Sequence, residues 1–194
     1  MRYTEDPSFW SAGAVATTLF MAVVLAALTI DTLKQITPGS PRVPAYDVIN
    51  RSVTYEYVPD RGEYAPKLAG EELLFGHRYT PDEAARLVAK GKLVIQSRAC
   101  IDCHTFFGNG AYYAPDLTRA WMDPFWARYP GPERADRIAK FLMHPFRLGA
   151  RAMPTLNIER DEAEATVAYL KWMSAVDSNG FPDRFGAAAS QAGK

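Results

Sequence analysis

The residues best suited to chemistry lie in one short segment, Cys100-Ile101-Asp102-Cys103-His104. Two thiols separated by two residues, and followed at once by an imidazole, have the spacing at which both sulfurs form thioethers to a haem while the histidine reaches the iron. A zinc half-site or a thioredoxin-type redox pair would use the same thiols, but zinc needs further ligands and the chain has only two cysteines. We therefore predict one covalent haem c on Cys100 and Cys103, with His104 as an axial ligand.

A second axial ligand must come from elsewhere in the chain. The side chains with a suitable sulfur or imidazole donor are Met122, Met143, Met153, Met173, His77 and His144. We favour Met153, because Pro154 directly after it stiffens a helix-free stretch in which the thioether is free to face the iron. Histidine and methionine ligation raises the reduction potential and leaves no open coordination position, which indicates electron transfer and not substrate binding at the iron.

The other donors have structural interpretations. Met143 and Met173 stand at helical spacing and are expected in the core. His144 precedes Pro145 at a predicted helix end and remains the main rival ligand, as a second axial histidine. We expect His77 at the surface.

Composition and charge narrow the class of protein. The chain has 194 residues, with 22 Lys and Arg against 22 Asp and Glu, and its apolar content is 48%. This length and composition fit one folded domain. Zero net charge without a basic run argues against nucleic-acid binding.

An uncharged segment of 21 residues runs from Trp10 to Ile30. As a helix it would be about 31 Å long, which matches the roughly 30 Å of a bilayer's hydrocarbon core. A cleaved signal peptide is the alternative, but its apolar region is usually shorter and follows a basic segment. We predict a retained anchor at 10–30 after a short segment at 1–9, with Trp10 at an interface. The basic residues on the two sides do not decide its orientation.

Three helices are expected after the anchor. Thr80, Pro81 and Glu83 form a helix start with a capping box, and apolar residues continue to Val94. Further helices are predicted at 132–143 and 161–176 from their apolar spacing. The proline-rich segment 31–79 is predicted to be an extended stalk with one short edge strand at 53–57, and 181–194 a flexible tail. The domain that positions the haem is therefore 80–180, and the fold class is all-α.

Residues 104–117, HTFFGNGAYYAPDL, closely resemble the HTLLGEGAY[FY]APEL pattern of the small cytochrome c subunit of bacterial nitric oxide reductase. Residues 151–156, RAMPTL, resemble the R-x-M-P-x-[LF] element of the same family. The resemblance covers about 85–178 well and 8–30 loosely, and Asn109 departs from the usual glutamate.

The resemblance implies a class I cytochrome c domain outside the cytoplasm, in the periplasm, with the anchor's N-terminus in the cytoplasm. In this fold the Pro115 carbonyl accepts the Nδ1 proton of the axial histidine, and Leu117 packs on the haem. Gly91 lets the first helix cross the last near Tyr169 and Leu170. Tyr113 is also expected against the haem.

The family accepts electrons from a soluble cytochrome c or a copper protein and passes them to a large subunit with haem b and non-haem iron, which reduces NO to nitrous oxide. The resemblance also implies an interface calcium held by the Gly110 carbonyl and the Tyr112 hydroxyl; packing of Tyr112 and Tyr113 against haem is the alternative. Three functions stay open: this electron-entry subunit, a monohaem subunit of another haem-copper oxidase or a free membrane-bound shuttle, and a gas-binding sensor. Residues 46–79 and 121–126 do not align with the family pattern and are candidate partner contacts.

Overall fold

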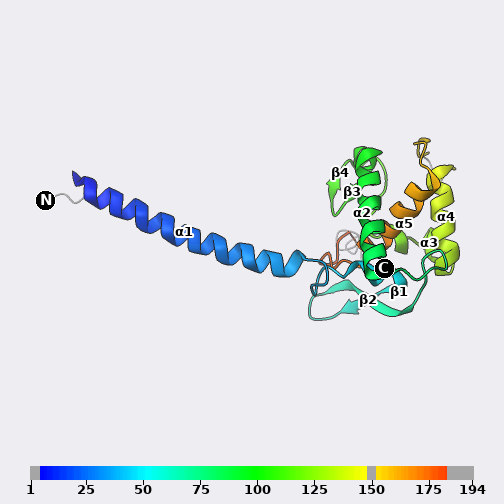
Figure 1. The fold of residues 1–194 in the computed structure, drawn as a ribbon, viewed down its shortest axis with the longest axis horizontal. Helices are drawn as coiled ribbons and strands as arrows, with labels where there is room; N and C mark the ends of the chain where they lie inside the picture. Colours follow the sequence, from blue (N-terminus) through cyan, green and yellow to red (C-terminus); the bar gives the residue numbers. More distant parts are fainter. Residues whose placement is uncertain (1–4, 148–151, 183–194) are drawn as a thin grey trace, which may run out of the picture.

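The computed structural model describes residues 5–147 and 152–182, which form a long N-terminal helix and a domain of helices with two small sheets (Figure 1). The predicted tail at 181–194 lies almost entirely outside the described residues. In chain order the elements are α1 (Pro7–Ile36), the 3-10 helix η2 (Tyr46–Asn50), β1 (Arg51–Val58), β2 (Glu63–Glu71), α2 (Pro81–Ser97), η3 (Cys100–Asp102), β3 (Thr105–Phe106), β4 (Asn109–Gly110), η4 (Ala120–Met122), α3 (Pro124–Ala127), α4 (Gly131–Met143) and α5 (Arg160–Ser174).

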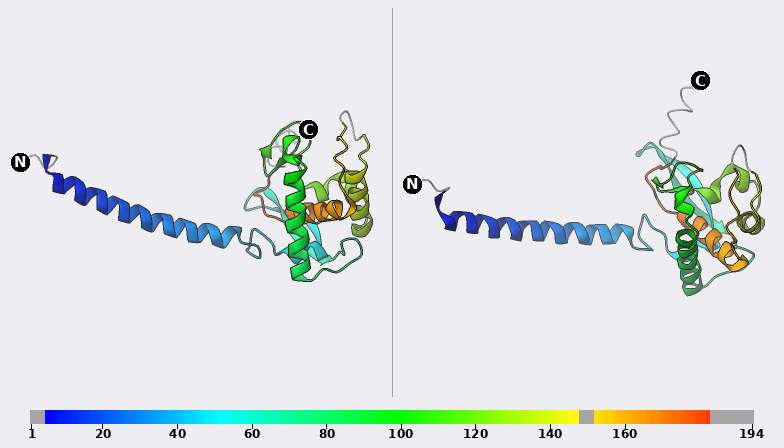
Figure 2. Two further views of the ribbon diagram at one scale, coloured as in Figure 1. Left: turned by 45° about the horizontal axis from the view of Figure 1, so that its top comes forward. Right: turned by 90° about the horizontal axis from the view of Figure 1, so that it is seen from above.

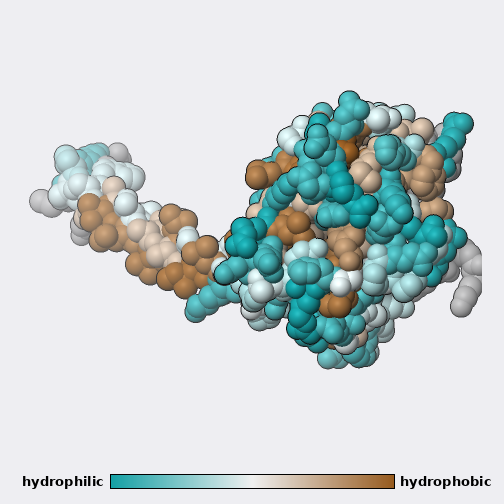
Figure 3. Space-filling model, turned by 45° about the vertical axis from the view of Figure 1, so that its right-hand side comes forward, coloured by the Kyte–Doolittle hydropathy of each residue, from teal (hydrophilic) through white to brown (hydrophobic). Residues whose placement is uncertain are grey.

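Helix α1 projects away from the domain (Figures 1 and 2). It starts at an N-cap, Asp6, whose carboxylate accepts a hydrogen bond from the Ser8 amide, and none of its residues is buried. Figure 3 shows apolar side chains covering most of its length, in contrast to the mainly hydrophilic face of the domain in that view. Among the described residues, α1 is the one helix long and apolar enough to cross a membrane. It exceeds the predicted span 10–30, because polar residues continue the helix at both ends.

Residues 46–79 differ from the predicted stalk. β1 and β2 form an antiparallel hairpin, and the adjoining η2 buries Val48, Ile49 and Asn50 in the domain. The Asn50 side chain donates a hydrogen bond to the Tyr79 carbonyl at 2.8 Å and accepts one from the Tyr79 amide at 2.9 Å. The alternating residues at 53–57 do form a strand, as predicted. The prolines stop helix formation here, but the backbone hydrogen bonds are satisfied within a sheet.

The three predicted domain helices are present as α2, α4 and α5. α2 starts with the expected capping box, in which Thr80 and Glu83 satisfy each other's backbone amides. α4 ends at His144, which is its C-cap. Helices α2 and α5 cross so closely that a Cβ on Gly91 would lie 2.0 Å from the Ala165 carbonyl oxygen and 2.8 Å from the Tyr169 Cβ. The predicted crossing through Gly91 is therefore confirmed.

A buried polar cluster connects α5 to the hairpin and α4. Lys171 is fully buried; its Nζ donates to the Glu72 carbonyl oxygen at 2.9 Å and lies 3.0 Å from the Glu72 carboxylate. The same Nζ lies 4.8 Å from the centre of the Trp121 ring, and the Arg134 guanidinium lies 4.7 Å from it. Burial lowers the pKa of Lys171 to about 8, although Glu72 opposes this shift. The cluster places two cations on one buried indole.

Candidate functional site

The two cysteines lie on a single tight turn directly after α2. Ala99 has a left-handed backbone (φ 53°), which ends α2 and turns the chain into the 3-10 helix that begins at Cys100. The His104 amide donates to the Cys100 carbonyl at 2.9 Å, so the turn closes on the histidine. Both thiols are free and half-buried, and burial raises the pKa of Cys100. The turn thus presents both sulfurs and the imidazole from one compact segment.

The imidazole of His104 has a fixed hydrogen-bond partner. Its Nδ1 lies 2.7 Å from the carbonyl oxygen of Pro115. A carbonyl only accepts hydrogen bonds, so Nδ1 must carry the proton and Nε2 of the neutral ring keeps a free lone pair. This is the hydrogen bond that the resemblance implied. A carbonyl that accepts from the far nitrogen of the ring orients a histidine for metal ligation and raises its basicity.

The chain from Thr105 to Thr118 folds back over the cysteine turn. The short strands β3 and β4 pair Thr105 with Gly110, where a Cβ would lie 2.2 Å from the His104 carbonyl oxygen. Gly110 has φ +125°, a conformation that favours glycine, so both the close approach and the backbone require this residue. The Ala114 amide then donates to the Cys103 carbonyl at 2.8 Å. The glycine-rich segment therefore determines where Pro115 meets the histidine.

Two side-chain hydrogen bonds that we did not predict close this loop. The Thr105 hydroxyl donates to the Asp116 carboxylate at 2.6 Å, and the Phe107 amide donates to the Thr118 hydroxyl at 2.7 Å. Thr118 is almost fully buried, at 1% exposure. Each pair is separated by 11 residues in the sequence, which is neither a helical nor a strand period, so no sequence pattern indicates it.

The site has an apolar floor from α2 and α5. A buried cluster of Ile95, Leu170 and Met173 is covered by half-buried side chains that include Cys100, Phe106 and Leu117. Leu117 therefore lies on the same apolar cluster as Cys100. Apolar surroundings and an oriented imidazole next to two thiols fit a covalently held haem, which needs donors on one side and an apolar contact surface.

The candidate second ligand lies on another segment. Met153 lies on 152–159, a described segment without helix that leads into α5; it is half-buried and packs on the main core. That stretch and the β3–β4 loop lie at the same end of the domain in Figure 1 and in the left view of Figure 2. Arg151, predicted as part of its motif, lies outside the described residues.

The rival donors take the positions expected of structural residues. Met173 is completely buried in the α5 core, and Met143 is half-buried on the main cluster. Met122 packs half-buried on the same core. His77 is exposed, and its ring contacts Tyr79 at 4.6 Å between centroids.

The residues suggested for calcium are at the surface of the glycine-rich loop. Tyr112 is 82% exposed, and its hydroxyl donates to the Gly108 carbonyl at 3.1 Å. Tyr113 is also exposed, at 58%. Within the part of the chain that the structure describes, no group of three or more His, Cys, Asp or Glu is suited to a metal ion.

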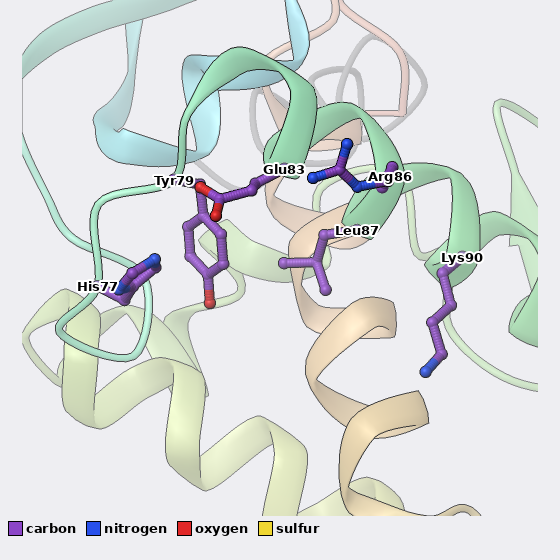
Figure 4. Close-up of a pocket in the computed structure, with 6 residues that line it drawn as sticks. All are labelled: His77, Tyr79, Glu83, Arg86, Leu87 and Lys90. Atoms are coloured by element: carbon purple, nitrogen blue, oxygen red, sulfur yellow. The ribbon is translucent and has the colours of Figure 1, made fainter.

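A separate surface pocket of about 280 Å³ lies at the start of α2 (Figure 4). Its lining residues are His77, Tyr79, Glu83, Arg86, Leu87 and Lys90. Burial raises the pKa of Tyr79, with smaller contributions from Glu164 and Glu83. None of the proposed haem-site residues lines this pocket, so it is not part of the cysteine site.

Comparisons with known proteins agree with this geometry. The cytochrome c family model matches residues 88–174, from α2 to the end of α5. The nitric oxide reductase C subunit of Stutzerimonas stutzeri is 33% identical over 114 residues, which cover 57% of this chain and 75% of that protein. The corresponding proteins of Paracoccus denitrificans (32% over 98 residues) and Halomonas halodenitrificans (30% over 96 residues) are each matched over 49% of this chain and 64% of their own length. The chain is therefore a member of the family of nitric oxide reductase C subunits, built on a cytochrome c domain.

Proposed function

We propose that this chain is the electron-entry subunit of a nitric oxide reductase, with one haem c bound through Cys100 and Cys103. The observation that carries the proposal is the 2.7 Å contact between His104 Nδ1 and the Pro115 carbonyl within a C-x-x-C-H turn. That contact prepares Nε2 as a ligand, and both thiols lie on the same turn. When bound, haem c supplies a one-electron iron centre.

The chain's own residues hold and shield this centre. The apolar surface made by Ile95, Leu117 and Leu170 keeps water from one side. Met153 would be the second ligand of the iron, because 152–159 has no helix and lies at the same end of the domain as the histidine loop. With His104 and Met153 both bound, the iron would have no open position for a substrate, and the domain would transfer electrons without binding NO. His144 is the C-cap of α4, and this structural role accounts for the residue without haem ligation.

The location follows from α1. We infer that 10–30 lies in the inner membrane, with the haem domain in the periplasm, where c-type haem is attached. The 30-residue helix is about 45 Å long, enough for the hydrocarbon core and both headgroup layers. Lys34 in the last turn lies outside the apolar span.

The partners are the remaining part of the proposal. A soluble cytochrome c or copper protein would deliver the electron, and a large subunit with haem b and non-haem iron would receive it and reduce NO. The exposed loop around Gly110 and Tyr112 is the proposed contact with that subunit and supplies two oxygen donors for a shared calcium ion. The large subunit and the haem propionates would complete the coordination.

The test is purification of the full chain from its own membranes through a tag after Lys194. We expect a large haem b subunit to co-purify and the preparation to consume NO with reduced cytochrome c. If the haem c protein is obtained alone and is inactive from cells that express the partner, it is a free membrane-bound shuttle. A reduced protein that readily binds carbon monoxide would instead indicate the gas sensor.

A further inference from the structure

The β1–β2 hairpin has an aromatic pair next to its turn that the electron-transfer site does not use. Tyr57 and Tyr64 are directly opposite each other, one pair before the turn. Their ring centroids lie 5.3 Å apart at an interplanar angle of 61°, and each residue is 51% exposed. Two rings in edge contact form one amphipathic surface, with apolar carbons and two hydroxyls.

This pair continues the face of the hairpin that packs on the domain. On β1, residues two apart share a face, and along this face Val53 is buried, Tyr55 half-buried and Tyr57 exposed. The Tyr55 hydroxyl donates to the Ser174 carbonyl at 2.5 Å, at the end of α5. The apolar face therefore extends beyond the edge of the core.

The hairpin end is firmly attached to the domain. Arg61, in the turn, makes two hydrogen bonds to the Asp177 carboxylate at 2.7 and 2.9 Å and an ion pair with Glu63 at 2.5 Å. Glu63 is buried, at 6% exposure, and Asp177 is held at a low pKa chiefly by its hydrogen bond from Arg61. The aromatic pair therefore has a fixed position relative to α5.

The turn of this hairpin points back toward the end of α1 from which the domain extends. All three views of Figures 1 and 2 place it on the side of the domain that faces the helix. The connection is also short and folded. The Trp172 indole donates to the Pro44 carbonyl at 3.0 Å, and the Asp177 amide donates to the Arg42 carbonyl at 2.8 Å. Since α1 ends at Ile36, only residues 37–41 separate it from Arg42, and this length of chain spans at most about 22 Å.

Given the membrane anchor of the proposed function, on which this inference rests, the bilayer surface is close to the hairpin. Residues 31–36 carry α1 about 9 Å past the end of the 10–30 span, through the headgroup layer. The domain follows within a few residues. We propose that Tyr57 and Tyr64 form a second contact with the membrane, at the level of the phospholipid headgroups.

Tyrosine is enriched at this depth because its ring is apolar and its hydroxyl reaches water. Asp60 and Arg61 in the adjacent turn rule out deeper insertion into hydrocarbon, so the contact is confined to the headgroup layer. With the anchor and the hairpin both in contact with the bilayer, rotation of the domain about the short connection is restricted.

The test measures depth in the full haem-loaded chain, reconstituted into phosphatidylcholine vesicles without any partner. A nitroxide on Tyr64→Cys reports its collisions with oxygen, which partitions into lipid, and with a water-soluble nickel complex. The matched control is Leu93→Cys on α2, a residue that is 64% exposed. Phe20→Cys in α1 reports insertion of the anchor. Chain without an added cysteine must take up no label, and an unchanged haem spectrum verifies folding of each variant.

We expect the ratio of oxygen to nickel collisions to be higher at Tyr64 than at Leu93, and lower than at Phe20. A label on Tyr57→Cys should give the same order. If the label at Tyr64 is exposed to water while the label at Phe20 is buried in lipid, the hairpin contact alone is overturned. A water-like Phe20 label overturns the anchor and the contact together. If the Tyr64 label is shielded from the nickel complex only after co-reconstitution with the large subunit, this surface is a protein interface and the membrane contact is overturned.

Discussion

Replacing Gly91 with alanine should separate α2 from α5 and destabilise the haem domain. The added Cβ would lie 2.0 Å from the Ala165 carbonyl oxygen, whereas ordinary contacts are at 3.4–4 Å. The neighbouring backbone must therefore move by about 1.4 Å, the difference between 3.4 and 2.0 Å. Both obstructing atoms of Ala165 are backbone atoms of a helix, so no flexible side chain can relieve the overlap.

Two opposing effects determine how much Gly91→Ala changes the free energy of unfolding. Alanine in a helix is about 1 kcal/mol more favourable than glycine. Overpacking costs about 1–3 kcal/mol and more where the neighbour is rigid. We expect a net loss of about 2 kcal/mol, equivalent to a fall in Tm of about 4–8 °C for a domain of this size.

The assay is thermal unfolding of the detergent-solubilised holoprotein, followed by circular dichroism in the haem absorption band. This signal excludes α1, which stays helical in detergent. Gly70→Ala is the control, because nothing lies within 4 Å of its added Cβ. An unchanged or raised Tm for Gly91→Ala would mean that helix propensity dominates, and it would refute the close-packed crossing.

Three further predictions concern the site and the core. Met153→Ala should leave haem attached through Cys100 and Cys103 but open the iron to carbon monoxide, as followed by absorption spectroscopy; an unchanged spectrum and potential would exclude Met153 as a ligand. Tyr112→Phe should reduce calcium content or assembly with the large subunit while the isolated domain's spectrum stays the same, and normal assembly with normal calcium would remove this role. For Lys171, burial lowers the pKa from 10.5 to about 8, so the folded protein binds fewer protons than the unfolded chain between these values. The free energy of unfolding should therefore rise with pH from about 8 to 10.5, by up to about 3 kcal/mol, and this gain is lost as the pH falls again through 8. Denaturant titrations across this pH range test the predicted rise. Lys171→Met should abolish the rise and destabilise the protein at pH 7 by about 3–5 kcal/mol, because Glu72 loses its cation. An identical pH dependence in the variant would show that Lys171 is not the group responsible.

The sequence predicted the elements whose signals are local. The capping box at Thr80 and the apolar spacing of α4 and α5 depend on residues three or four apart, and these elements are present. The hydrogen bond between His104 and Pro115 was also expected, through the family resemblance. Close helix contact at Gly91 followed from the same source.

Long-range pairing could not be predicted from the sequence. The prolines of 31–79 suggested an extended stalk, but η2 and the hairpin pack on the domain through contacts such as the Tyr55 hydroxyl with Ser174. Lys171 did give a signal that we did not use. It stands four residues after Val167, on the apolar face of α5, where a charged residue must find a buried partner. Its partner, Glu72, is 99 positions away and has no sequence signal.

The C-terminal end of α5 has a mechanical consequence. Trp172 holds the connection from α1, and Ser174 holds the hairpin through Tyr55. In the same last turn of α5, Leu170 and Met173 support the floor beneath the cysteine turn. Because the proposed hairpin contact restricts rotation of the domain, a tilt of the anchor, such as a thinner bilayer would impose, would strain the connection at Pro44 and reach the cysteine site through this one helix. Bilayer thickness would then act on the redox centre through α5, without altering its ligands.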